Sequence, residues 1–389
     1  MDTVSIMNIK ASFFASREQL LYLLAAAVPI AFTAWNALLN NFVVEVAGFD
    51  GEKIGLLQSI REVPGLLAFS IVFVLMIFRQ QSAAYFSLAL LGLGTLLTGF
   101  FPSTVGLYAT TLLMSVGFHY LETLHSSLSL QWISKEKAPS FLGKLSALRS
   151  LMALFILAIL YVMMKIFDVG YIAIYVLSGG ITMLLAVIAW VGFEHFKDDV
   201  VQETKLFLRK KYWLFYILTF LAGARRQIVV VFAGFLLVEK FHFSVENMLL
   251  LLIANTIINM ICAPYAGKLI ERFGENLSLK LEYICIVLIF ILYGLVQSQI
   301  MAVSLYILDN LFYTIAIALK TYFQKIADPK DIAVTSGVAS AINHIAAVFL
   351  PFTLGIVWIN SHSAVFFIGA AIAMVAFLLA FLIPKKETE

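Results

Sequence analysis

The chain has 389 residues, of which 62% are hydrophobic and 13% are charged, and its formal net charge is +3. Soluble proteins carry about 25% charged residues, so this composition excludes an ordinary soluble domain and indicates a protein whose solvent is lipid. The small net charge gives no reason to expect nucleic acid as a partner.

Twelve apolar segments follow one another along the chain, and each is long enough to cross a bilayer core of about 30 Å. None shows the strict alternation of a membrane β-barrel strand, so we expect an all-α integral membrane protein. The first segment continues past Ala25–Ala27 to Val46, which favours an uncleaved helix over a signal peptide. The predicted spans are residues 20–46, 54–78, 83–101, 104–130, 141–165, 168–192, 213–238, 246–267, 277–298, 301–323, 332–358 and 363–384.

Basic residues are distributed unevenly over the segments that connect these spans. With an inside N-terminus, nineteen of the 26 lie inside, three lie outside (Lys53, Lys165 and Lys240) and four lie within spans. Cytoplasmic loops carry the excess of Lys and Arg. We therefore expect a multi-pass protein of the cytoplasmic (inner) membrane, with both termini in the cytoplasm.

The longest charged interruption, Glu194–Lys211, separates the sixth span from the seventh. It predicts an N-terminal six-helix bundle over residues 1–192, a cytoplasmic linker over 193–212 and a C-terminal six-helix bundle over 213–389. The halves are weakly self-similar, because the segment after span four aligns with the segment after span ten and pairs Arg149 with Asn343. Duplicated halves are typical of secondary transporters, which bind substrate near the midplane between the repeats.

With twelve spans, two halves, a charged central loop and inside termini, the chain resembles the major facilitator superfamily. One local motif supports this: Gly267–Gly274, GKLIERFG, is similar to the family's G-x-x-x-[DE]-R-x-G loop. Asn276 stands where the family usually has a basic residue, and the matching loop of the first half, Phe78–Gln81, lacks the pattern. The resemblance implies a transporter that works as a monomer, and it implies no cofactor.

The motif itself has a physical interpretation. Glycines at 267 and 274 permit a tight turn against a neighbouring helix. Glu271 and Arg272 can cap helix ends and build a charge network. Gly267, Glu271, Arg272 and Gly274 are therefore expected to form a conformational gate loop, and the alternative is a solvated short loop.

Span seven places two adjacent arginines, Arg225 and Arg226, near the middle of the bilayer. An arginine there costs about 2.5–3.5 kcal/mol on insertion scales, which points to a functional role. Neighbouring positions point about 100° apart, so we expect one arginine to face the cargo and the other to pair with an acid. The resemblance implies that spans one, four, seven and ten line the cavity. The alternative is that both arginines sit in fixed ion pairs.

Span two carries Arg61 and Glu62 just before Pro64, which is expected to kink the helix. Because the two charges are adjacent, we do not expect them to neutralise each other, and both need partners from other helices. Arg61 is a candidate for substrate binding and Glu62 for proton coupling. The alternative is a periplasmic gate network.

Span four carries His119, Glu122 and His125 at steps of three, which form one broad helix face. Glu122 and Arg149 lie at similar distances from the loop that joins spans four and five, so they can pair. A carboxylate near histidines is suited to a proton relay. The H-x-x-E-x-x-H spacing is not that of a zinc helix, so no metal is predicted. The alternative is a structural ion pair between hydrogen-bonded core histidines.

The remaining embedded polar residues complete the predicted site. Asp309 in span ten is the expected counter-charge for Arg225 or Arg226 and a candidate for proton coupling, as is His344. Polar side chains that can contact a substrate, or alternatively join helices, are Asn36, Asn40, Asn255, Asn259, Tyr313 and Asn343.

Four embedded arginines against Glu62, Glu122 and Asp309 leave a surplus of one positive charge, which favours an anionic cargo. The leading hypothesis is a proton-coupled symporter or antiporter of a small or medium organic or phosphorylated anion, working by alternating access. One alternative is a proton-driven exporter of lipophilic drugs or cations. Another is a non-transporting, lipid-handling or sensing protein. No nucleophile–base pair or nucleotide loop suggests an enzyme.

Overall fold

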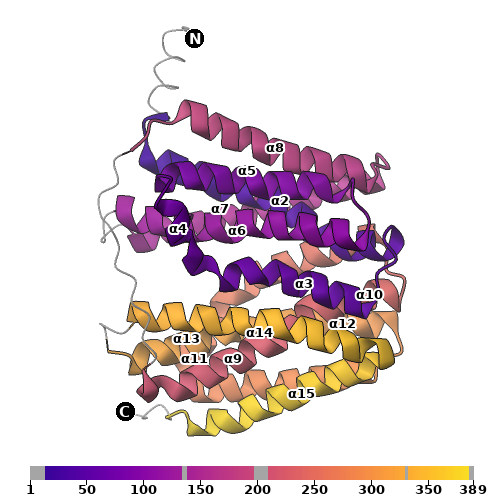
Figure 1. The fold of residues 1–389 in the computed structure, drawn as a ribbon. Helices are drawn as coiled ribbons and strands as arrows, with labels where there is room; N and C mark the ends of the chain where they lie inside the picture. Colours follow the sequence, from indigo (N-terminus) through magenta and orange to yellow (C-terminus); the bar gives the residue numbers. More distant parts are fainter. Residues whose placement is uncertain (1–13, 134–137, 197–208, 329–331, 385–389) are drawn as a thin grey trace. The chain divides into compact units, whose positions relative to one another are not determined.

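The computed structural model describes residues 14–133, 138–196, 209–328 and 332–384. Throughout these ranges the chain forms helices and no strands (Figure 1). Ten of the described helices are long and apolar enough to cross a membrane. They are Arg17–Glu45, Gln80–Thr98, Phe141–Lys165, Tyr171–Gly192, Lys210–Glu239, Val245–Cys262, Tyr265–Gly294, Gln299–Ile326, Val338–Asn360 and His362–Leu382. The other two predicted spans, two and four, are also helical, so the predicted all-α membrane fold is confirmed.

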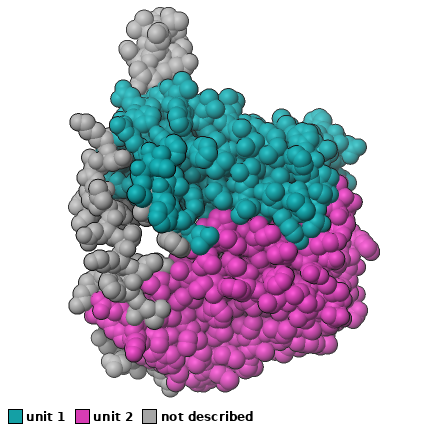
Figure 2. Space-filling view, viewed as in Figure 1, with its two compact units in different colours: residues 1–42, 67–203 teal, residues 43–66, 204–389 magenta. Residues whose placement is uncertain are grey.

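The chain divides into two compact units (Figure 2). Unit 1 comprises residues 1–42 and 67–203, and unit 2 comprises residues 43–66 and 204–389. Span two is therefore shared between the units, a feature that no sequence pattern indicated. The functional division into bundles 1–192 and 213–389, joined by linker 193–212, stays a prediction.

Close helix contacts hold unit 1 together. Helix α5 packs against α6 and α8, and small residues stand at the contacts. A Cβ on Gly94 or Gly117 would overlap backbone atoms across the α5–α6 contact. Because lipid is as apolar as a protein core, such close packing replaces the hydrophobic effect as the force that joins membrane helices. The helices of this unit are α2 (Arg17–Glu45), α5 (Gln80–Thr98), α6 (Thr104–Trp132), α7 (Ala138–Lys165) and α8 (Tyr171–Gly192).

Span two is broken rather than kinked. Helix α3 (Gly51–Leu66) ends two residues after Pro64 and is followed by a 3-10 turn (Ala68–Ser70) and the short helix α4 (Ile71–Leu75). Proline removes a hydrogen-bond donor and clashes with the preceding turn, which explains the break. Within unit 2, α3 packs tightly on α14 (Ile332–Asn360), where a Cβ on Gly55 would overlap the carbonyl of Pro351.

Spans seven and ten also depart from α-helical geometry, each directly after its polar residues. In span seven, α9 (Trp213–Gln227) passes into a π-helical segment (Ile228–Ala233) and then α10 (Gly234–Glu239). In span ten, α12 (Gln299–Tyr313) passes into a 3-10 turn (Thr314–Ala316) and then α13 (Ile317–Ile326). Such departures are frequent at functional sites. The unit is completed by α11 (Val245–Gly294) and α15 (His362–Leu379).

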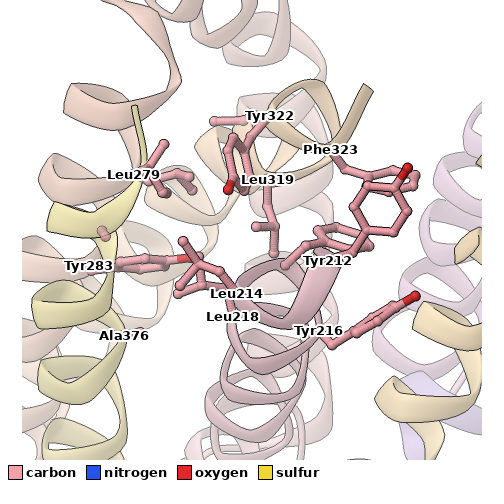
Figure 3. Close-up of a cluster of buried hydrophobic side chains, with 14 of the residues drawn as sticks. Tyr212, Leu214, Tyr216, Leu218, Leu279, Tyr283, Leu319, Tyr322, Phe323 and Ala376 are labelled. Carbon is pink, nitrogen blue, oxygen red and sulfur yellow. The ribbon is translucent and has the colours of Figure 1, made fainter. Parts of the chain in front are cut away.

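A cluster of buried apolar side chains fixes the first half of α9 in unit 2 (Figure 3). Leu218 of α9 packs there with Leu279 and Tyr283 of α11, and the rings of Phe215 and Phe323 stack with centroids 4.3 Å apart. Because closely packed protein interiors tolerate little displacement of their side chains, the cluster holds α9 in one register. That register sets where Arg225 and Arg226 point one turn further along.

Candidate functional site

The embedded charges form three groups, and each group lies within one unit. In unit 1, Arg149 Nη1 donates to Glu122 Oε2 at 2.7 Å, which confirms the predicted pair. Arg149 Nη2 lies 3.1 Å from His125 Nδ1, and His125 Nε2 lies 3.0 Å from the carbonyl oxygen of Leu21.

These two contacts assign the tautomer of His125. A carbonyl oxygen only accepts, so Nε2 carries the hydrogen; a guanidinium only donates, so Nδ1 accepts. His125 is therefore neutral in this arrangement and orients Arg149. The ring of His119 instead lies edge-on against Phe118, with centroids 5.1 Å apart. Among the described residues, no three His, Cys, Asp or Glu side chains come together as a metal site.

The second group lies at the contact of α3 and α14 in unit 2. Arg61 Nη2 donates to Glu62 Oε1 at 2.6 Å, and Glu62 Oε2 lies 3.1 Å from His344 Nδ1. The prediction that Arg61 and Glu62 cannot neutralise each other is wrong, because these long side chains bend toward each other although their Cα atoms are adjacent. His344 supplies the expected partner from another helix.

The third group, which we call the C-terminal charge cluster, consists of Arg225 and Arg226 on α9, Glu282 on α11, and Asp309 and Tyr313 on α12. Arg225 Nη2 forms an ion pair with Glu282 Oε1, and their side chains are 2% and 0% exposed. Asp309 was expected to be the counter-charge for Arg225 or Arg226, and the ion pair of Arg225 is made instead by Glu282. Asp309 acts on Arg225 and Arg226 only through longer-range electrostatics.

Glu282 was missing from the predicted set, although it stands within the predicted span 277–298. Including it changes the charge count, since four embedded arginines now face four embedded carboxylates. The surplus positive charge disappears. The case for an anionic cargo must therefore rest on which arginine remains without a carboxylate.

Arg226 is that arginine. Its guanidinium carbon lies 3.8 Å from the centroid of the Tyr313 ring, a cation–π distance. The side chain is half-buried, and it has no ion pair with a carboxylate among the residues that the structure describes. Asp309 is 4% exposed, and its carboxylate makes no hydrogen bond within the same ranges. A guanidinium and a carboxylate, neither fully satisfied, thus lie on facing helices.

The predicted amides are scattered around these groups. Asn343 is exposed, and its side-chain oxygen packs against Gly223, just before the cluster, where a Cβ would displace that side chain. The Oδ1 atoms of Asn255 and Asn259 are buried and without hydrogen-bond partners in the described part of the chain. In unit 1, Asn36 is exposed and Asn40 half-buried.

The predicted gate loop lies at a break inside α11. Gly274 has a φ of 78°, a conformation that favours glycine, whereas a Cβ on Gly267 would meet nothing. Glu271 and Arg272 are exposed. The next residues make further polar contacts: Glu275 pairs with the exposed Lys325 at 2.7 Å. The buried amide of Asn276 donates to the carbonyls of Ala380 and Ile383. Asn276 thus ties this loop to the end of α15.

A family model described as Major Facilitator Superfamily matches residues 21–351. The chain belongs to the Major Facilitator Superfamily. The superfamily and its fold are those of transporters, so this member is a multi-pass membrane protein of the secondary-transporter class, whose proteins bind small-molecule substrates.

Solved structures agree with this fold. The nucleoside transporter NupG matches with 14% identity and a TM-score of 0.72, covering 95% of this chain and 99% of that one. A bacterial homologue of the human lysosomal transporter Spinster, in an inward-facing and occupied conformation, matches with 12% identity and a TM-score of 0.74, covering 94% and 96%. Among curated proteins, no match was found. Identities this low show the fold alone.

Proposed function

We propose that this protein is a proton-coupled secondary transporter of a small or medium organic or phosphorylated anion, and that Arg226 binds the anion. The observation that carries the proposal is the half-buried Arg226 guanidinium, which is held over Tyr313 and has no ion pair with a carboxylate among the described residues. A guanidinium offers a planar set of donors that matches a carboxylate or phosphate. Arg225, Arg61 and Arg149 already donate to carboxylates, so their contribution to anion binding is secondary.

Charge balance then links the anion to a proton. With all groups ionised, Arg225 and Arg226 balance Glu282 and Asp309, and the cluster is neutral. Binding an anion at Arg226 adds a negative charge to a buried site, which is costly in a medium of low dielectric constant. One proton on Asp309 restores neutrality. Asp309 suits this role because no hydrogen bond from a described residue holds its carboxylate in the ionised form.

The breaks in spans seven and ten support the same location. The π-helical segment begins directly after Gln227 and the 3-10 turn directly after Tyr313. Both therefore adjoin the C-terminal charge cluster. Discontinuous helices are the usual element of transporter binding sites, because freed backbone groups and altered register accommodate a substrate. The roles of Asn36, Asn40, Asn255, Asn259 and Asn343 as further substrate contacts, and of Glu62, Glu122, His119 and His344 in proton coupling, belong to this proposal.

The runner-up, a proton-driven exporter of lipophilic cations, is favoured by the buried carboxylate of Asp309 near Tyr306 and Tyr313. A cation would bind the ring face of Tyr313, which the Arg226 guanidinium already covers. That contact favours the anion. The third hypothesis is a non-transporting lipid-handling or sensing protein. Cysteine labelling from only one side of the membrane would support it.

The test is uptake by the purified protein in proteoliposomes with an imposed pH gradient. Labelled mono- and dicarboxylates, sugar phosphates and nucleosides are offered in turn, and a fluorescent lipophilic cation is included for efflux. We expect accumulation of at least one anion that disappears when a protonophore collapses the gradient. Transport of the cation or a nucleoside, with no anion accumulated, would overturn the proposal.

The matched variants are Arg226→Ala and Arg226→Lys. At an anion concentration near half-saturation for the natural protein, we expect the alanine variant to lose most of the uptake. The lysine variant, which keeps the charge but not the planar fork, should retain more of it. The same vesicles test the predicted placement of both termini on the cytoplasmic side. In each protein molecule, a protease added outside the vesicles should then cleave both chain ends or neither.

A further inference from the structure

The Arg225–Glu282 pair leaves polar atoms without partners. Glu282 Oε2 and Arg225 Nε are both buried and have no hydrogen-bond partner among the described residues. Buried polar atoms in folded proteins are almost always satisfied, by protein groups or by ordered water. An ion pair with only a structural role gains from satisfying all its atoms, because each buried polar atom left unpaired destabilises the fold. The Arg149–Glu122 pair of unit 1 leaves the same two kinds of atom without partners. What distinguishes the Arg225–Glu282 pair is its complete burial and the further polar atoms on the helices that carry it.

Further unsatisfied atoms belong to the two helices that carry the pair. The hydroxyls of Tyr283 and Tyr293 on α11 and of Thr219 on α9 are buried without partners in the described ranges. The Tyr283 ring centroid lies 5.7 Å from the Arg225 guanidinium carbon, and the ring projects from α11 toward α9 (Figure 3). Tyr293 interacts electrostatically with Asp309. The unsatisfied atoms thus accompany both carboxylates, Glu282 and Asp309.

A buried water needs two to four polar partners, and this group of atoms supplies them. We infer that ordered water lies among α9, α11 and α12 and that Glu282 shares the transported proton with Asp309 through it, an inference that rests on the proton coupling proposed above. In the transfer, Glu282 gives its proton to a water oxygen and that water gives another of its protons to an Asp309 oxygen. No other bond changes, and nothing is oxidised or reduced.

Charge counting shows why two carboxylates are needed. Glu282 and Asp309 interact with each other and both interact with Arg225, which is the one fully buried cation of the cluster. With one shared proton, the remaining carboxylate still balances Arg225. The charged and titratable groups that act on either carboxylate, as far as the described residues show, are Arg225 and Arg226 from α9, Tyr283 and Tyr293 from α11, and Tyr306 from α12.

Infrared difference spectroscopy tests this inference without any substrate. The full chain, reconstituted in phosphatidylethanolamine–phosphatidylglycerol vesicles, is titrated with pH while the stretching band of protonated carboxyls is recorded, in water and in heavy water. The variants are Glu282→Gln, Asp309→Asn and the double variant. Glu52→Gln, which changes an exposed carboxylate on α3, is the matched control.

We expect each single variant to remove part of the band and to move the midpoint of the remaining carboxyl by at least about one pH unit, a tenfold change in proton affinity. The double variant removes the part of the band that comes from these two buried carboxyls, and the control leaves that part unchanged. Tyr293→Phe moves the midpoint by a smaller amount, because it removes one partner of the water. If Glu282→Gln leaves band and midpoint unchanged, Glu282 is a fixed ion-pair partner and the inference is wrong.

A second variant covers the case in which Glu282→Gln does not fold. Arg225→Gln together with Glu282→Gln removes both charges, so no buried arginine is left unpaired. An Asp309 midpoint in this variant equal to that of the natural protein would overturn the inference, and a moved midpoint supports it. The spectroscopic test contains no anion, so it is independent of the cargo. A shared proton without anion transport would refute only the proposed cargo. Anion transport without a shared proton would refute only the role of Glu282.

Discussion

The charged groups of the two units differ in the way their atoms are satisfied. In unit 1 the Arg149 and Glu122 side chains are 28% and 33% exposed, and the arginine is also held by the neutral His125. In unit 2 the Arg225–Glu282 pair is fully buried. In both pairs, one carboxylate oxygen and the arginine Nε are buried without a hydrogen-bond partner among the described residues. Next to the Arg225–Glu282 pair, Arg226 and Asp309 have no direct ionic partner in the described part of the chain.

Judged by burial alone, the Arg225–Glu282 pair of unit 2 would have the structural role, and the more exposed Arg149–Glu122 pair of unit 1 would not. The direct partners of the charges point the other way. In unit 1, Arg149 pairs with Glu122 and also contacts His125, whereas in unit 2 Arg226 and Asp309 lie beside the buried pair with no direct ionic partner among the described residues. A count of embedded charges therefore does not locate a candidate binding site, whereas the direct partners of each charge do.

Asp309→Asn should have the largest effect. Asparagine cannot take up or release a proton, so pH-driven accumulation of the anion is expected to fall to the level of protein-free vesicles. Exchange of labelled for unlabelled anion, which needs no net proton movement, should continue. Uphill accumulation that survives in this variant would show that the proton binds elsewhere, and the Glu122–Arg149 group of unit 1 would become the better candidate.

Arg226→Ala should come next. A hydrogen bond to a charged group contributes about 1.5–3 kcal/mol, so the half-saturating anion concentration should rise roughly 10–150-fold. The variant is measured as initial uptake against anion concentration, with Arg226→Lys as the control. An unchanged half-saturating concentration would remove the observation on which the anion proposal rests.

The pair of unit 1 should respond more weakly. Because Arg149 and Glu122 are each about one-third exposed, we expect a coupling energy below about 1 kcal/mol. A double-mutant cycle with Arg149→Ala, Glu122→Ala and the double variant, followed by thermal unfolding in detergent, measures it. A coupling of about 3 kcal/mol or more, as for a desolvated pair, would contradict the contrast between the units.

His125→Gln should have the smallest effect. His125 donates to the carbonyl of Leu21 and accepts from Arg149, and a glutamine amide can also donate and accept. Anion uptake measured across a range of pH should therefore keep its profile, with at most a modest loss of rate. A displaced profile would show that His125 changes its charge during transport and would restore the predicted relay of span four.

The sequence alone determined the fold class and most of the spans. A lipid solvent requires each crossing segment to satisfy its own backbone, so about 20 apolar residues in a row predict a helix almost regardless of tertiary context. The pairing of Glu122 with Arg149 was also predictable, because both lie near the same short loop. Span two was only partly predictable, since Pro64 indicates a disturbance but not that α3 groups with unit 2.

Only the tertiary structure decided which charges are satisfied. Arg225 and Glu282 are 57 positions apart, and nothing in the periodicity of either helix indicates that their atoms meet. Asp309 looked like the natural partner because it carries the right charge at a similar depth. Ion pairing depends on distances of a few ångströms between side chains of separate helices, and those distances are set by how α9, α11 and α12 pack rather than by the composition of any one of them.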